Sequence, residues 1–160
     1  LKDGAAAEAT FQRALAADPD NLDTLRSIEA LQRMPGRERD LVGTLRRRAR
    51  LEGDPRDKQQ LLREAAELAE RTLGDTALAV ASLKQVLEEN DAEVWALEEL
   101  TRLREAAGDW EDVASLLLRR AEHTADGGDA LALKHRAAQV FVERLADEGR
   151  AIELYRDILE

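Results

Sequence analysis

The sequence repeats itself with a period of 72 residues. Comparing each residue with the one 72 positions later gives 24 identities in 88 pairs, whereas an offset of 36 gives only 12 in 124, close to chance for this composition. The identities run through the whole chain without a break in register, from Asp3 and Asp75 near its start to Leu87 and Leu159 near its end. A repeat unit of this kind buries its apolar face only when a neighbouring unit covers it, so the period limits the fold to a repetitive architecture.

The residues inside each repeat favour helix. Charged residues make up 36% of the 160 residues and aromatic residues only 3%, with 9 Gly and 3 Pro to interrupt helices and no Cys. Apolar residues recur at intervals of three and four, as in Leu61, Leu62, Ala65 and Ala66, which is the spacing of a helix face. Arg outnumbers Lys 20 to 4, a bias that we attribute to a GC-rich bacterial genome. The sequence therefore predicts an all-α chain.

Helix-breaking residues place the ends of these helices. Pro19, Gly36, Pro55 and Gly74 each follow an apolar periodic segment, where proline and glycine end helices. The connections are too short for anything but antiparallel neighbours. We expect nine helices, at about 5–17, 22–33, 38–52, 57–73, 77–89, 92–107, 110–124, 129–146 and 149–160.

Several segments resemble the tetratricopeptide repeat family. Ala7, Phe11, Ala14 and Pro19 have the spacing of the second helix and terminal proline of that repeat, and Gly108-Asp109-Trp110 resembles its inter-helix turn. The likeness covers the whole chain but is loose over 22–52 and 92–124. It implies a right-handed α-solenoid of helical hairpins, a superhelix with a concave groove, in one array over residues 1–160 with two alternating hairpin types.

The resemblance also implies which residues face the groove. In this family, ligands contact the face of each first helix opposite its packing stripe. Trp95 has two alternative roles, packing between helices or anchoring a ligand. The groove residues expected on this basis are Arg63, Glu67, Glu70, Trp95, Glu98, Arg102, His135 and Gln139.

A basic segment offers a second candidate surface. Eight Arg against four acids lie between Arg33 and Arg56 in a chain whose net charge is −10. This segment either is a solvated face paired with neighbouring carboxylates or docks an acidic partner. Because no aromatic residue is interleaved for base stacking, nucleic acid is disfavoured. The candidate residues on this helix are Arg39, Arg46, Arg47 and Arg50.

The sequence offers little material for catalysis or metal binding. His123 and His135 lie on different expected helices, and no spacing typical of a zinc site occurs. The segment 18–23 lacks the Gly and Glu of a calcium loop, and the Gly pair at 127–128 is flanked by acids that would repel phosphate. We therefore expect no enzymatic activity, no cofactor and no metal.

These observations predict a non-catalytic scaffold for protein–protein interaction. The partner would be a peptide or protein, and an acidic segment would suit the basic helix. The alternatives are self-association through the solenoid ends, or a docking domain of an enzyme or secretion component. The chain begins at Leu1 and ends at Glu160 inside an expected helix, so we expect an excerpt of a longer array. No apolar run is long enough to span a bilayer, and the compartment, cytoplasm or periplasm, stays open.

Overall fold

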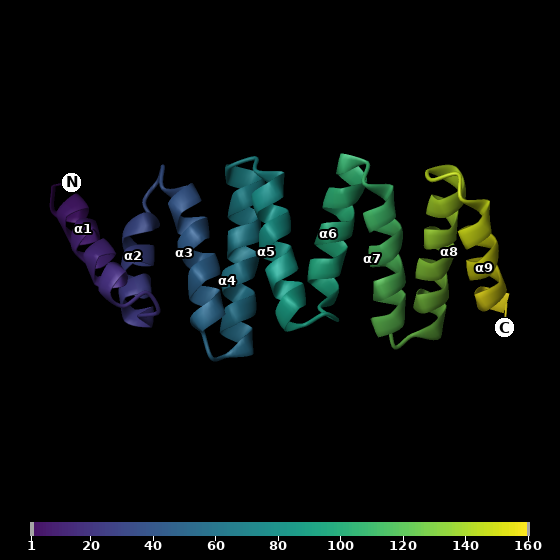
Figure 1. Ribbon diagram of the computed structural model, residues 1–160, viewed down its shortest axis with the longest axis horizontal. Coiled ribbons are helices and arrows are strands. Elements are labelled where there is room, and N and C mark those ends of the chain that lie inside the picture. The colour runs from purple at the N-terminus through teal and green to yellow at the C-terminus, as the bar shows by residue number, and fades with distance from the viewer. Residues whose placement is uncertain (1, 160) are drawn as a thin grey trace. The chain divides into compact units, whose positions relative to one another are not determined.

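The computed structural model describes residues 2–159, with the side chains of residues 6, 7 and 9–159 (Figure 1). These residues form nine α-helices and one π-helical turn, and none of them lies in a strand. The all-α fold expected from the sequence is therefore confirmed. In chain order the elements are α1 (Lys2–Ala17), α2 (Leu22–Gln32), α3 (Glu38–Leu51), α4 (Pro55–Glu67), η1 (Leu68–Thr72), α5 (Thr76–Glu89), α6 (Val94–Ala107), α7 (Trp110–His123), α8 (Gly127–Glu143) and α9 (Glu148–Leu159).

The helices recur with the period of the sequence. Residues 72 positions apart, called equivalent residues below, begin four pairs of helices. These pairs of first residues are Leu22 and Val94, Glu38 and Trp110, Pro55 and Gly127, and Thr76 and Glu148. The repeated sequence thus specifies a repeated backbone.

The chain divides into two compact units, residues 1–86 and 87–160, with the division inside α5. Within the first unit α1 packs against α2, α2 against α3, and α3 against α4 and η1. Within the second unit α6 packs against α7, α7 against α8, and α8 against α9. The single array over 1–160, and with it the right-handed superhelix and its groove, stays a prediction.

The first unit is held together by aliphatic side chains that point between its helices. Leu25 of α2, Val42 and Leu45 of α3, and Leu62 of α4 are at most 1% exposed. Burying each of these side chains contributes roughly 1.5–3 kcal/mol relative to leaving it in water. A helix with such an apolar face is stable only when neighbouring helices cover that face.

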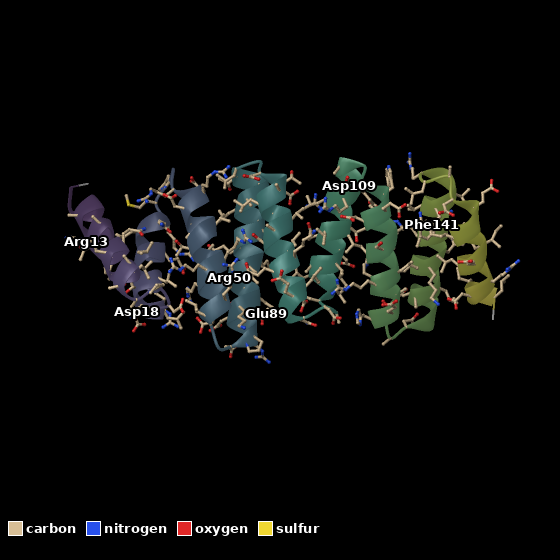
Figure 2. All side chains as sticks on the ribbon, in the orientation of Figure 1. Arg13, Asp18, Arg50, Glu89, Asp109 and Phe141 are labelled. Carbon is tan, nitrogen blue, oxygen red and sulfur yellow. The ribbon has the colours of Figure 1, made fainter. Side chains whose placement is uncertain are left out.

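The second unit has an equivalent core. Val113 and Leu117 of α7 are fully buried against Ala137 and Phe141 of α8, and Phe141 is labelled in Figure 2. Trp110 is half-buried beside this cluster, and the guanidinium carbon of Arg144 lies 4.6 Å from the centroid of its ring. The small residue at 137 lets α7 and α8 approach closely.

The segment formed by α4 and η1 and the equivalent helix α8 both end in a wide turn. The Leu73 amide donates to the carbonyl of Leu68 at 3.1 Å, five residues back, and the equivalent Leu145 amide donates to Val140 at 3.2 Å. In the first unit this turn is η1, the π-helical continuation of α4. In the second unit α8 ends at Glu143, earlier than the expected 146, because these hydrogen bonds already belong to the turn.

One ion pair occurs in both units with its charges exchanged. Arg33, the C-cap residue of α2, bridges to Glu64 of α4 at 2.5 Å, and the equivalent residues Glu105 of α6 and Arg136 of α8 also pair. Glu64 is the main cause of a raised pKa of the Arg33 guanidinium. The pair therefore links α2 to α4 in the first unit and α6 to α8 in the second, although the arginine comes from the opposite member of the pair.

Candidate binding site

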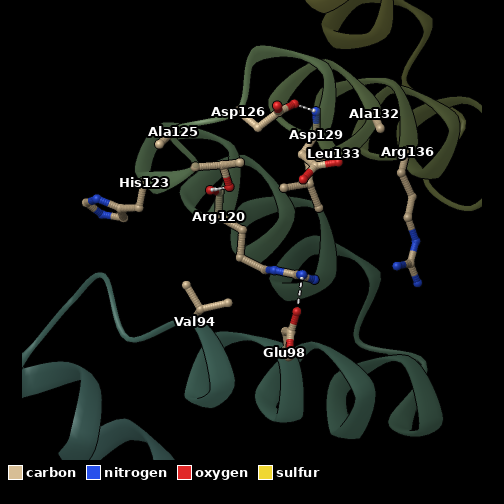
Figure 3. A pocket seen from close by; sticks show the side chains of 11 residues that line it. Val94, Glu98, Arg120, His123, Ala125, Asp126, Asp129, Ala132, Leu133 and Arg136 are labelled. Carbon is tan, nitrogen blue, oxygen red and sulfur yellow. Dashed lines mark hydrogen bonds and ion pairs between the residues drawn. The ribbon is translucent and has the colours of Figure 1, made fainter.

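The second unit contains an open hollow between α6 and α8, with the end of α7 between them (Figure 3). Its volume is about 660 Å³. Val94 and Glu98 come from α6, and Leu133 and Arg136 come from α8. The complete lining is Val94, Glu98, Arg120, His123, Thr124, Ala125, Asp126, Asp129, Ala132, Leu133 and Arg136.

Three residues that line the hollow are smaller than their equivalents in the first unit, whereas Ala125 and Arg136 are larger than Gly53 and Glu64. Val94, Thr124 and Ala132 are equivalent to Leu22, Glu52 and Gln60. In the first unit the Glu52 carboxylate reaches α2 and pairs with Arg26 at 3.4 Å. In the second unit the Thr124 hydroxyl instead donates to the carbonyl of Arg120 at 2.6 Å. The shorter Thr124 therefore replaces an interhelix ion pair of the first unit with a hydrogen bond inside its own turn.

The two arginines of the hollow already have partners. The Arg120 guanidinium donates to Glu98 at 2.6 Å, across from α7 to α6, as the dashed line in Figure 3 shows. Arg136 pairs with Glu105, which lies outside the lining. The positive charges of the hollow are thus neutralised within the unit.

Two carboxylates at the start of α8 form no ion pair within the described part of the chain. Asp126 is the N-cap residue of α8, and its Oδ1 accepts from the Asp129 amide at 2.9 Å. Among the described residues the Asp129 carboxylate makes no hydrogen bond or ion pair, and it is exposed. These two acids give the mouth of the hollow an excess of negative charge beside the apolar Leu133 and Val94.

The expected groove residues of the second unit only partly surround this hollow. Glu98 lines it, whereas Arg102 pairs with Glu99 at 2.7 Å and Trp95 is half-buried. His135 directs its ring edge-on to Tyr155 of α9 with the centroids 5.7 Å apart, and Gln139 is exposed outside the lining. Most of the lining was missed, because the resemblance pointed to a different stripe of α8.

The expected groove residues of the first unit lie on α4 and η1. Arg63 and Glu67 of α4 are exposed, and Glu70 of η1 is half-buried. Neither Arg63 nor Glu67 lines any of the hollows described here. Their role in binding stays a prediction.

The basic helix is α3, and several of its arginines hold the first unit together. Arg39 pairs with Asp75 at 2.9 Å, and the Arg46 guanidinium donates to the carbonyl of Ala81 in α5 at 3.4 Å. Arg47 donates to the carbonyl of Pro19, as the equivalent Arg119 does to that of Asp91 at 3.1 Å.

Residues of α3 nevertheless line two open hollows. They have volumes of about 390 and 410 Å³, and both are lined by Gly43 and Arg47. Arg50, which is exposed and labelled in Figure 2, lines the second hollow and has no ion pair within the described part of the chain. Of the four expected arginines, Arg50 is therefore the one with an uncommitted charge.

The perturbed carboxylates keep their negative charge. The amide of Leu78 and the guanidinium of Arg39 lower the pKa of Asp75, and Arg150 lowers the pKa of Glu111 through a bidentate ion pair at 2.7 and 2.8 Å. A general acid needs the opposite shift, toward the protonated form at neutral pH. These carboxylates therefore serve as helix caps and ion-pair partners.

The described residues form neither a cluster of metal ligands nor a helix that could span a membrane. No group of three or more His, Asp or Glu side chains between residues 2 and 159 could hold a metal ion together. No helix in the same range has the length and apolarity that crossing a bilayer requires.

Comparison with known proteins finds a likeness to solved structures but none to a protein family or a curated protein. No protein-family model matches the chain, and no curated protein matches it. Two crystal structures of MamA resemble it at 14% identity and a TM-score of 0.49, covering 99% of this chain and 82% or 88% of the MamA chain. At this distance the likeness carries no inference about what the chain binds.

Proposed function

We propose that the chain is a non-catalytic scaffold that binds a peptide or protein segment in the hollow between α6 and α8. The observation that carries the proposal is the open space of about 660 Å³ beside Val94, Thr124 and Ala132, each of which is smaller than its equivalent residue in the first unit. Pockets that bury ligand groups have volumes of roughly 300–1,000 Å³. The resemblance to tetratricopeptide repeats supports the same role.

A binding role also agrees with the chemistry of the described residues. Their perturbed carboxylates are caps and ion-pair partners, and the hollow offers apolar surface from Val94 and Leu133 with polar groups around it. Sites that recognise a partner combine an apolar centre with a polar rim in this way. The binding energy would come from burying apolar surface, and charge would select the partner.

The second candidate function is docking of an acidic segment on α3. The uncommitted charge of Arg50 beside the hollow around Gly43 favours it. The same surface would serve a docking domain of a larger enzyme or secretion component. Because Arg39, Arg46 and Arg47 have intramolecular partners, this surface has less charge to offer than the sequence predicts.

Selection of random peptides displayed on phage tests the proposal. The baits are the wild-type chain, Ala132→Gln, which fills the hollow, and Arg50→Glu, which reverses the charge on α3. We expect peptides that bind the wild type and Arg50→Glu but not Ala132→Gln. Peptides that fail only on Arg50→Glu would favour the second candidate, and the absence of any selected peptide would contradict the proposed function.

A further inference from the structure

We infer that the hollow between α6 and α8 takes a cationic peptide in which an aliphatic side chain stands next to Lys or Arg. This inference rests on the proposed function and names its partner class. It follows from the contacts of the hollow, from the balance of its charges, and from the comparison of equivalent residues in the two units.

The aliphatic part of the ligand follows from the lining. Val94 is 51% exposed at the start of α6, and Leu133 faces the same space from α8 with Ala132 beside it (Figure 3). An apolar side chain that covers these groups removes their surface from water, with a gain of roughly 25 cal/mol per Å². No ring in the lining other than that of His123 offers stacking, so an aliphatic side chain fits better than an aromatic one.

The cationic part follows from the charges. Arg120 is bound to Glu98 and Arg136 to Glu105, so neither guanidinium is available to a carboxylate ligand. Asp126 and Asp129 form no ion pair with any residue that the structure describes. The carboxyl end of α7 and the amino end of α8 meet at this edge, so their partial charges offset each other and the two carboxylates supply the negative charge. A formal charge of −10 on the chain favours the approach of cations.

His123 is the remaining titratable group in the lining. Its ring extends away from Arg120 in Figure 3, and its Nε2 lies 3.9 Å from the Asp91 carboxylate. A protonated His123 would therefore pair with Asp91. It does not supply a positive charge to Asp126 or Asp129.

Two lining residues of the hollow have longer equivalents in the first unit. Glu52, equivalent to Thr124, pairs with Arg26, and Gln60 is equivalent to Ala132. Four other lining residues are identical to their equivalents, namely Arg120 and Arg48, Asp126 and Asp54, Asp129 and Asp57, and Leu133 and Leu61. The short side chains at 124 and 132 therefore distinguish the second unit, whereas the acids are common to both.

Fluorescence anisotropy with short labelled peptides tests this inference. The probes carry the core Lys-Leu-Lys, Glu-Leu-Glu or Lys-Gly-Lys and are otherwise identical. We expect Lys-Leu-Lys to bind most tightly, because it alone supplies both the charge and the aliphatic group. Its affinity should fall as salt is raised, since partly exposed charges are screened.

Matched variants locate the binding. Ala132→Gln introduces the residue that the first unit tolerates, and it should weaken Lys-Leu-Lys binding by about tenfold by occupying the hollow. Asp129→Asn should weaken it by about threefold, the effect of one exposed charge pair. The control Asp57→Asn makes the same change in the first unit and should leave the affinity unchanged. Thermal unfolding of each variant verifies that it folds.

The outcomes separate this inference from the proposed function. Equal binding of Lys-Gly-Lys, or equal weakening by Asp57→Asn, would show nonspecific attraction to an acidic chain and overturn the inference. Preference for Glu-Leu-Glu that depends on Arg50 would also overturn it, while the role as a scaffold would stand. Peptides selected from a random library that require the hollow but lack Lys and Arg would overturn the partner class alone.

Discussion

Gly74 and Ala146 are equivalent residues that adopt the same left-handed backbone conformation, with φ of 62° and 52°. The hydrogen bonds around them also match. The Asp75 amide donates to the Ala69 carbonyl and the Asp147 amide to the Phe141 carbonyl, both at 2.8 Å. The second unit therefore keeps a left-handed turn that favours glycine, although Ala146 occupies that position.

Replacing Ala146 by glycine should stabilise the second unit. A residue with Cβ loses roughly 1 kcal/mol in this conformation, and a smaller gain in unfolded-state entropy offsets part of the benefit. We expect Ala146→Gly to raise the free energy of unfolding by about 0.5 kcal/mol in urea denaturation. Gly74→Ala is the reciprocal variant and should lower it, so stabilisation by Gly74→Ala would contradict the equivalence of the two turns.

Gly43 offers a stabilising change in the first unit. It lies in the interior of α3, it is exposed, and a Cβ built on it would meet no atom within 4 Å. We expect Gly43→Ala to raise the free energy of unfolding by about 0.5–1 kcal/mol, because alanine restricts the unfolded chain and favours helix. Gly43→Ser, which introduces the residue found at the equivalent position 115, should give a smaller gain. A loss of stability in both variants would show that this face of α3 is covered.

Leu45 and Leu117 are equivalent and fully buried. Truncating either to alanine should lower the free energy of unfolding by about 2–5 kcal/mol, through lost burial and the cavity that remains. Because the chain consists of two compact units, Leu45→Ala should accelerate amide hydrogen exchange mainly in residues 2–86, and Leu117→Ala mainly in 87–159. Equal acceleration throughout both units would instead indicate a single cooperative domain.

The helix caps make stability depend on pH. The Arg150 amide and guanidinium lower the pKa of Asp147, whose Oδ1 accepts from that amide at 2.9 Å. A carboxylate with a lowered pKa in the folded state stabilises the protein above its unfolded pKa of about 3.9, and this contribution is lost as the pH falls through the folded value.

The measurement compares urea unfolding of the wild type and Asp147→Asn across this range. The difference between them should be constant above a pH of about 5 and should shrink below about 4. Asp20→Asn, at an exposed carboxylate with no hydrogen bond or ion pair within the described residues, provides the control and should show little pH dependence. A difference for Asp147→Asn that persists undiminished at the lowest pH would rule out the ionic cap.

The period and the breaker residues were sufficient to predict the helices, since capping and apolar spacing act locally. The hollow was not predicted, because the resemblance directed attention to the stripe of His135 and Gln139. The informative signal was the reduction in side-chain size from Gln60 to Ala132 at equivalent positions.

Ion pairs with exchanged charges were also hidden from the sequence comparison. Arg33 and Glu105 count as a mismatch, and so do Glu64 and Arg136. Their compensation appears only when the two positions are known to lie in contact. The same is true of Arg47, whose bond to the Pro19 carbonyl depends on how α3 packs against the preceding turn.

The 72-residue sequence period is also a structural period, and we propose that its second copy contains a binding site in the hollow between α6 and α8. Nuclear magnetic resonance in solution can measure both properties, from 13C secondary shifts and from amide shifts during titration with the Lys-Leu-Lys peptide. We expect helical shifts that repeat in register for 22–87 and 94–159, and peptide-induced changes centred on Val94, Asp129 and Leu133. Helices out of register between the units would rule out the structural period, and peptide-induced changes confined to α3 would rule out the site in the hollow.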